Sequence, residues 1–152
     1  MRVFFLTTLL VVAADQLSKA WIVSYPQGQL IFEVGFFLLI HIHNTGAAFG
    51  LFQDHSLPLT IVALVGVAIL LIYALFIYRR FPSLANMQNR IVLGLILGGT
   101  VGNLIDRLRL GYVTDFISIG IWPAFNIADS AITVGVILFA YSLLTLARVR
   151  KQ

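Results

Sequence analysis

Long apolar segments that contain carboxylates are the feature that most constrains how this chain can fold. Four of the six acidic residues lie in or beside such segments, at Asp15, Asp106, Asp115 and Asp129. A carboxylate at the centre of a bilayer costs roughly 2.5–3.5 kcal/mol, so chains carry such groups mainly where they have a function. The sequence therefore predicts a membrane protein whose acidic residues take part in its chemistry.

The composition supports one membrane domain over residues 1–152. Hydrophobic residues make up 60% of the chain and charged residues 11%, whereas soluble domains average about 25% charged residues. The absence of cysteine excludes disulfides, thiol nucleophiles and thiolate metal sites. The net charge of +4 comes from basic residues at segment ends, so it does not indicate a nucleic-acid partner.

Four segments are long and apolar enough to cross a bilayer, which requires about 20 residues. The predicted helices span residues 3–23, 57–78, 88–108 and 127–146. The first segment also has features of a signal peptide, because Arg2 precedes an apolar stretch and small residues. It continues apolar through Trp21 to Val23, so we expect a retained helix.

The distribution of basic residues predicts the orientation of the helices. With the N-terminus in the cytoplasm, seven of the ten basic residues fall on the cytoplasmic side. Both termini are then cytoplasmic. The polar clusters of the first, third and fourth helices all fall toward the opposite, outer side. This convergence predicts a functional site near the outer face of the membrane.

The segment 29–52 is too irregular for a fifth span and is rich in residues that favour strands. We expect a small β-rich sheet on the outer face, half embedded at the membrane interface. The predicted fold class is therefore a mainly α membrane protein, a four-transmembrane-helix bundle with this small β-rich sheet. The segment 108–125 is expected to be a short connection between the third and fourth helices.

Small residues predict how two of the helices pack. Gly94, Gly98 and Gly102 form a stripe with a spacing of four residues, which allows close helix approach in lipid. The last helix offers Ala131 and Gly135. We therefore expect the third and fourth helices to pack tightly, which brings the polar ends of both helices together.

Asp115 and Asp129 are the candidate catalytic residues. If Asp115 folds back toward Asp129, one ionised carboxylate can take a proton from water while the other, protonated, hydrogen-bonds the carbonyl under attack. Two close carboxylates tend to share one proton. The alternative is structural, because each aspartate precedes an apolar run and could cap a helix.

Other polar residues are candidates for substrate contact or for support of the aspartates. Asp15 and Lys19 are four residues apart and can pair on one helix face. Arg107 is expected to reach a carboxylate or a lipid phosphate, and Asn44 to donate to a bound peptide. Structural support and a turn role are the alternatives. The strand pair His41 and His43 lacks an evident third ligand, so we expect no metal and no cofactor.

Five motifs, in order along almost the whole chain, resemble those of the bacterial lipoprotein signal peptidases (signal peptidase II). They are Asp15–Lys19, Asn44–Phe49, Gly102–Arg107, Val113–Phe116 and Phe125–Asp129. The resemblance implies an intramembrane aspartyl endopeptidase of the bacterial inner membrane, with its active site and a small β-rich cradle on the periplasmic side. It implies prolipoprotein substrates that carry diacylglyceryl on a cysteine, with cleavage just before that cysteine.

The resemblance also implies roles for individual residues. Asp115 and Asp129 would be the catalytic pair. The substrate-binding or supporting residues would be Asp15, Lys19, Asn44, Gly46, Asn103, Asp106, Arg107 and Asn126, with Asp106 mainly structural. Cyclic peptides of the globomycin type would inhibit by occupying the site, and we expect a monomer.

Two other functional classes remain open from the residues alone. Intramembrane carboxylates can relay protons in a transporter or channel. Against this, the polar groups cluster on one side, and the sequence shows no internal repeat of the kind found in many transporters. A non-catalytic scaffold subunit is the third class, and it would tolerate loss of each carboxylate.

Overall fold

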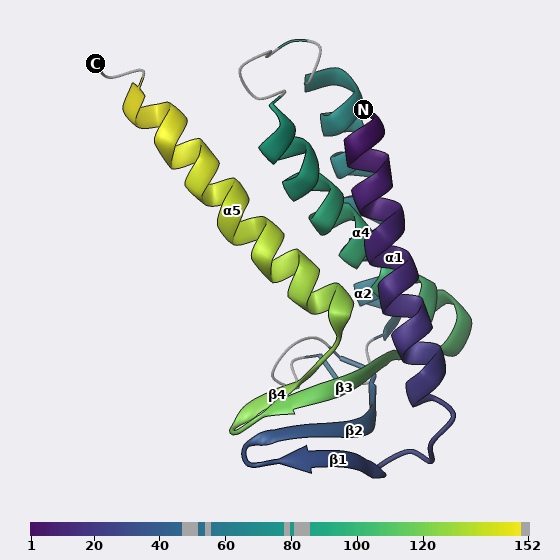
Figure 1. The fold of residues 1–152 in the computed structure, drawn as a ribbon. Helices are drawn as coiled ribbons and strands as arrows, with labels where there is room; N and C mark the ends of the chain where they lie inside the picture. The colour runs from purple at the N-terminus through teal and green to yellow at the C-terminus, as the bar shows by residue number, and fades with distance from the viewer. Residues whose placement is uncertain (47–51, 54–55, 78–79, 81–85, 150–152) are drawn as a thin grey trace.

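Four long helices dominate the computed structural model, which describes all residues except 47–51, 54–55, 78–79, 81–85 and 150–152 (Figure 1). The helices are α1 (Arg2–Ile22), α2 (Ser56–Ile72), α4 (Met87–Leu110) and α5 (Ile127–Val149). A π-helical turn, Tyr73–Ile77, extends α2. All four are long and apolar enough to cross a membrane. The prediction of four spanning helices is confirmed.

Helix α4 is the centre of the bundle and contacts each of the other three helices. Its apolar residues Leu93 and Leu97 pack with Phe4 of α1 and Ala74 of the π-helical turn. By contrast, among the described residues of α2, Thr60 alone is buried within the protein. The exposed apolar side chains of α2 suit contact with lipid, where burial within the protein is not required.

The predicted close packing of α4 against α5 is confirmed, but the glycine stripe itself lies mainly against α1. A Cβ added at Gly94, Gly98 or Gly102 would lie 2.6–2.7 Å from side-chain atoms of α1. The close contacts with α5 are made instead by Gly99 and by Gly135, which meets α4 from the other helix. The spacing of four identified a close-packed face, but it could not say which neighbour covers that face.

A four-stranded antiparallel sheet lies at one end of the bundle, with the strand order β1-β2-β3-β4. The strands are β1 (Leu30–Val34), β2 (Phe37–Asn44), β3 (Val113–Ile119) and β4 (Trp122–Phe125). The predicted β-rich insertion supplies β1 and β2. The sequence reasoning missed β3 and β4, which lie in the segment expected to be a simple connection.

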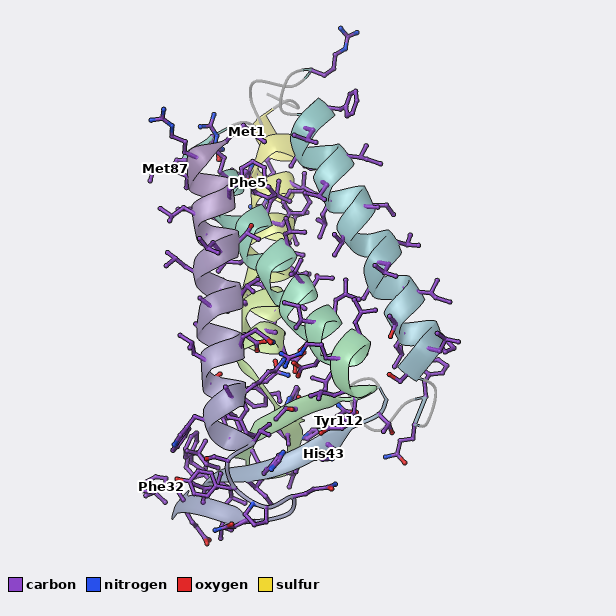
Figure 2. The ribbon with its side chains drawn as sticks, turned by 90° about the vertical axis from the view of Figure 1, so that its right-hand side faces the viewer. Met1, Phe5, Phe32, His43, Met87 and Tyr112 are labelled. Carbon is purple, nitrogen blue, oxygen red and sulfur yellow. The ribbon has the colours of Figure 1, made fainter. Side chains whose placement is uncertain are left out.

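The sheet end and the opposite end of the bundle differ clearly. The start of α1 and the end of α5 lie away from the sheet (Figure 1). In Figure 2, Met1 and Met87 lie at that far end, whereas Phe32, His43 and Tyr112 mark the sheet end. Between α4 and β3, Gly111 adopts a left-handed conformation with φ 79°, which favours glycine. This turn carries the chain from α4 directly into the strand that bears Asp115.

Candidate active site

Asp115 and Asp129 line one cavity of about 740 Å³ at the sheet end of the bundle. Asp115 lies within β3, opposite Ile42 of β2, and its exposed fraction is 2%. It therefore does not cap a helix, and the capping alternative is wrong for this residue. Asp129 lies in the first turn of α5. The cavity wall combines residues from the sheet, α4 and α5.

Asp129 forms a reciprocal cap with Asn126, the residue just before α5. The backbone N–H of Asp129 donates to Asn126 Oδ1 at 2.9 Å, and the backbone N–H of Asn126 donates to Asp129 Oδ2 at 3.3 Å. This is the geometry of a capping box, which satisfies two otherwise unpaired donors of a helix N-terminus. Asp129 Oδ2 therefore takes part in capping α5, as the capping alternative expects, while Asp129 Oδ1 accepts a hydrogen bond from Asn103.

Three asparagine side chains direct their amide groups at the two carboxylates. Asn44 donates to Asp115 Oδ2 at 2.8 Å and Asn126 donates to Asp115 Oδ1 at 2.7 Å. Asn103 donates to Asp129 Oδ1 at 2.7 Å. These residues come from β2, from the start of α5 and from α4. The structure therefore brings together site residues predicted from four separate motifs.

The orientation of each asparagine amide is fixed by what its own oxygen accepts. Asn44 Oδ1 accepts from the backbone N–H of Gly46 at 2.9 Å, and Asn126 Oδ1 accepts from the backbone N–H of Asp129. Asn103 Oδ1 accepts from the ammonium group of Lys19 at 2.9 Å. A backbone N–H and an ammonium group can only donate. Each amide must therefore turn its NH₂ group toward an aspartate.

A second polar group, the ionic cluster, consists of Asp15, Lys19 and Asp106 and lies where α1 meets α4. Lys19 Nζ is 2.8 Å from Asp15 Oδ2 and 3.1 Å from Asp106 Oδ2. Gln16 donates to Asp106 Oδ1 at 3.1 Å. The predicted pairing of Asp15 with Lys19 is confirmed. Gln16 lies inside the first motif but was not among the predicted site residues.

The ionic cluster is tied to both elements that carry the aspartates. Asp15 Oδ1 accepts from the backbone N–H of Ala128, next to Asp129, at 3.0 Å. Asp106 Oδ2 accepts from the backbone N–H of Thr114, next to Asp115, at 3.0 Å. Each carboxylate of the cluster thus fixes the backbone beside one of the two aspartates.

Arg107 and Gly46 connect α4 to the loop after β2. The guanidinium group of Arg107 donates to the carbonyl oxygen of Gly46 at 3.2 Å, and both residues line the cavity. The sequence had predicted a carboxylate or a phosphate as the partner of Arg107. Residues 47–49 of the predicted loop motif lie outside the described residues.

Burial dominates the electrostatics of Asp115. The pKa of Asp115 is raised to about 7, first by desolvation on burial and then by the nearby charge of Asp129. The hydrogen bonds from Asn44 and Asn126 and the charge of Lys19 act in the opposite direction. A carboxyl group with a pKa near neutrality can exchange a proton at physiological pH, which general acid–base catalysis requires.

The two histidines that the sequence analysis considered as metal ligands, His41 and His43, both lie on β2. His41 and His43 Nε2 atoms are 3.2 Å apart, His41 Nδ1 contacts the carbonyl oxygen of Tyr25 at 2.7 Å, and His43 stacks on Tyr112. Burial lowers the pKa of His43. Among the described residues, no three histidine or acidic side chains converge as metal ligands would.

Comparison with known proteins identifies the family of this chain. Residues 7–145 match the model of the peptidase A8 family, described as signal peptidase (SPase) II. A lipoprotein signal peptidase of Dehalococcoides mccartyi is 54% identical over 136 residues, covering 89% of this chain and 84% of the relative. One of Moorella thermoacetica is 46% identical over 144 residues, covering 93% and 92%.

The fold is also similar to that of a known membrane enzyme. A solved structure described as a bacterial membrane enzyme superposes with a TM-score of 0.85 at 31% identity, covering 95% of this chain and 89% of the other. Four helices able to span a membrane, together with the match to a peptidase family, define the class as a polytopic membrane protease. The chain belongs to the signal peptidase II family of bacterial inner-membrane proteases, which process prolipoproteins. Membership favours the protease over the transporter and the scaffold.

Proposed function

We propose that Asp115 and Asp129 form the catalytic dyad of an aspartic endopeptidase that cleaves prolipoproteins just before their diacylglyceryl-modified cysteine. The observation that carries this proposal is the shared cavity, on whose wall both carboxylates lie among three oriented amide donors. Other carboxylates of the chain that lie in the bundle, Asp15 and Asp106, are bound to Lys19 instead.

The reaction follows from one proton shared by the dyad. The ionised carboxylate takes a proton from water while the water oxygen attacks the scissile carbonyl carbon, and the protonated carboxyl group hydrogen-bonds the carbonyl oxygen. Collapse of the tetrahedral intermediate breaks the C–N bond, and a dyad proton passes to the leaving nitrogen. The products are a signal peptide with a new carboxylate and a lipidated cysteine with a free amino group.

The cavity suits this substrate in shape and polarity. The apolar part of its wall includes residues of the sheet and of α5, and the proposed dyad belongs to its polar part. The apolar residues include Ile119, Trp122, Pro123, Ile132 and Val134. The lipid tail of the substrate can remain in the bilayer while its scissile bond lies at the dyad. Asn44, Gly46 and Arg107 also line the cavity and are the proposed substrate contacts.

The orientation in the membrane follows from the basic residues. Arg2 and Arg148 belong to the end of the bundle that lies away from the sheet. By the positive-inside rule this end is cytoplasmic, which places both termini in the cytoplasm and the cavity toward the periplasm. The enzyme acts as a monomer, and a globomycin-type cyclic peptide inhibits it by filling the cavity.

A cleavage assay tests the proposal. Purified wild type and Asp115→Asn are incubated in detergent with a prolipoprotein that carries diacylglyceryl and with the same precursor unlipidated, and products are resolved by gel shift. We expect cleavage by wild type alone and of the lipidated precursor alone. Near-normal turnover by folded Asp115→Asn contradicts the dyad, and equal cleavage of both precursors contradicts the substrate class.

A further inference from the structure

We propose that Lys19 is a positioning residue of this active site, whose charge acts through the amide of Asn103 to favour a negative charge on the dyad. This inference rests on the proposed function, because it concerns the same two aspartates. Lys19 lies on α1 and its exposed fraction is only 3%. It is therefore a buried cation that the hydrolysis steps themselves do not use.

The path from Lys19 to the dyad consists of two short hydrogen bonds. Lys19 Nζ donates to Asn103 Oδ1 at 2.9 Å, and Asn103 Nδ2 donates to Asp129 Oδ1 at 2.7 Å. An amide that accepts from a cation becomes a stronger donor at its other end, because hydrogen bonds in a chain polarise one another. The positive charge of Lys19 thus stabilises a negative charge on Asp129 through Asn103, without a direct ion pair.

The three asparagines differ in what holds them. Asn44 and Asn126 are anchored by backbone N–H groups, whereas Asn103 is anchored by a charged side chain. Asn126 Nδ2 also donates to Asn103 Oδ1, at 3.1 Å. The orientation of the Asn103 amide therefore survives the loss of Lys19, and what is lost is the charge behind it.

The other charged residues around the dyad explain why the positive charge of Lys19 matters. Helix α1 presents Asp15 and Lys19 to the site, α4 presents Asp106 and Arg107, and β3 presents Asp115. The titratable groups of β2, His41 and His43, interact with each other and with Tyr25 and Tyr112. Without Lys19, the carboxylates of Asp15 and Asp106 would stand beside the dyad with much less compensation, and each would oppose its negative charge.

The test compares the pH dependence of turnover in two variants, one that removes a positive charge and one that removes a negative charge. Lys19→Met removes the cation, and we expect the acidic limb of the kcat profile to move to higher pH by roughly one unit, as for an opposite charge removed nearby. The kcat near neutral pH should fall by about 10-fold, with KM little changed. Asp15→Asn removes a negative charge instead, and its acidic limb should move to lower pH.

Gln16→Met is the matched control. Gln16 is uncharged and donates to both carboxylates of the ionic cluster, Asp15 and Asp106, and to the carbonyl oxygen of Gly102. Among the described residues, its hydrogen bonds do not reach Asn103. We expect this variant to lose thermal stability while its acidic limb stays in place. A purely structural role for Lys19 would give the same pattern in Lys19→Met, with lower stability and an unmoved limb, and would overturn the proposal.

Two results keep the inference separate from the proposed function. If Lys19→Met does not fold, Asp15→Asn decides, and an acidic limb that stays in place or moves upward overturns the inference. If folded Asp115→Asn and Asp129→Asn retain turnover, the dyad itself is wrong. An essential dyad combined with unmoved limbs contradicts only the role of Lys19.

Discussion

The ionic cluster contains two buried carboxylates, and the proposed aspartate dyad contains one buried and one half-buried carboxylate, yet the partners of the two groups differ. In the ionic cluster, Asp15 and Asp106 bind the ammonium group of Lys19. In the dyad, all four carboxylate oxygens accept from N–H groups of asparagines. A cation holds a carboxylate in its ionised form, whereas neutral donors leave a buried carboxyl group able to gain a proton. The comparison teaches that the two groups differ in the charge of their partners, and this difference underlies the catalytic role proposed for Asp115 and Asp129.

The largest expected effect is the loss of turnover on substitution within the dyad. In Asp129→Asn the side chain can still accept from Asn126 N, so the cap of α5 is retained while proton transfer is lost. We expect kcat to fall by about 10²–10⁴-fold, the usual contribution of a general acid–base group. Single-turnover cleavage and thermal unfolding in detergent measure both properties. Turnover within a few-fold of wild type would contradict the assignment.

The equivalent aspartate-to-asparagine substitution in the ionic cluster, Asp106→Asn, should mainly lower the free energy of unfolding. Asp106→Asn removes one charge from the pair with Lys19 and weakens the bond to Thr114 N. Loss of one partner of a buried ion pair costs about 3–5 kcal/mol. We expect a lower free energy of unfolding, while cleavage per folded molecule falls far less than in Asp129→Asn. An equal loss of cleavage in both variants would remove the distinction between the two groups.

A smaller loss of stability is expected where α4 touches the ionic cluster. A Cβ at Gly102 would lie 2.6 Å from Asp15 Oδ2, so Gly102→Ala must displace that carboxylate. Overpacking of this kind costs about 1–3 kcal/mol. Gly66→Ala in α2 is the control, because a Cβ there meets nothing within 4 Å. Equal unfolding temperatures for the two variants would show that the close approach of α1 and α4 is unimportant.

The smallest effect is a shift in pH dependence. The dyad needs one proton, so turnover should fall as pH rises above about 7, the pKa of Asp115. The hydrogen bond from Asn44 lowers this pKa, so Asn44→Ala raises it further and moves the alkaline limb of the kcat profile to higher pH. The loss in kcat should be about 10-fold or less. An alkaline limb that moves to lower pH would reverse the sign and contradict this account.

The helices and the identity of most site residues could be predicted because their signals are local. A span needs about 20 apolar residues, and charged residues inside such spans are conspicuous. Strands β3 and β4 were missed because Val113–Ile119 is short and lies next to a helix end, although its β-branched residues and the following Gly120 are a usable signal.

Partners were harder to predict than elements. The glycine stripe identified a close-packed face of α4 but not that α1 covers it. The spacing also could not predict that Asn44 turns toward Asp115, or that Arg107 binds the carbonyl oxygen of Gly46. These contacts join segments far apart in the chain, and they depend on how the sheet is placed against the helix ends.

The pairing of Asp15 with Lys19 has a consequence for how the chain enters the membrane. The two residues lie one helical turn apart on α1 and 2.8 Å from each other. Because α1 is synthesised long before α4, Asp106 is not yet present when α1 first meets the bilayer. A single charge at the centre of a span costs roughly 2.5–3.5 kcal/mol. Because Asp15 and Lys19 are each other's counter-ions, the part of α1 that follows Arg2 carries no net formal charge as it crosses the bilayer. It can therefore deliver Lys19 to the position where α4 later meets it.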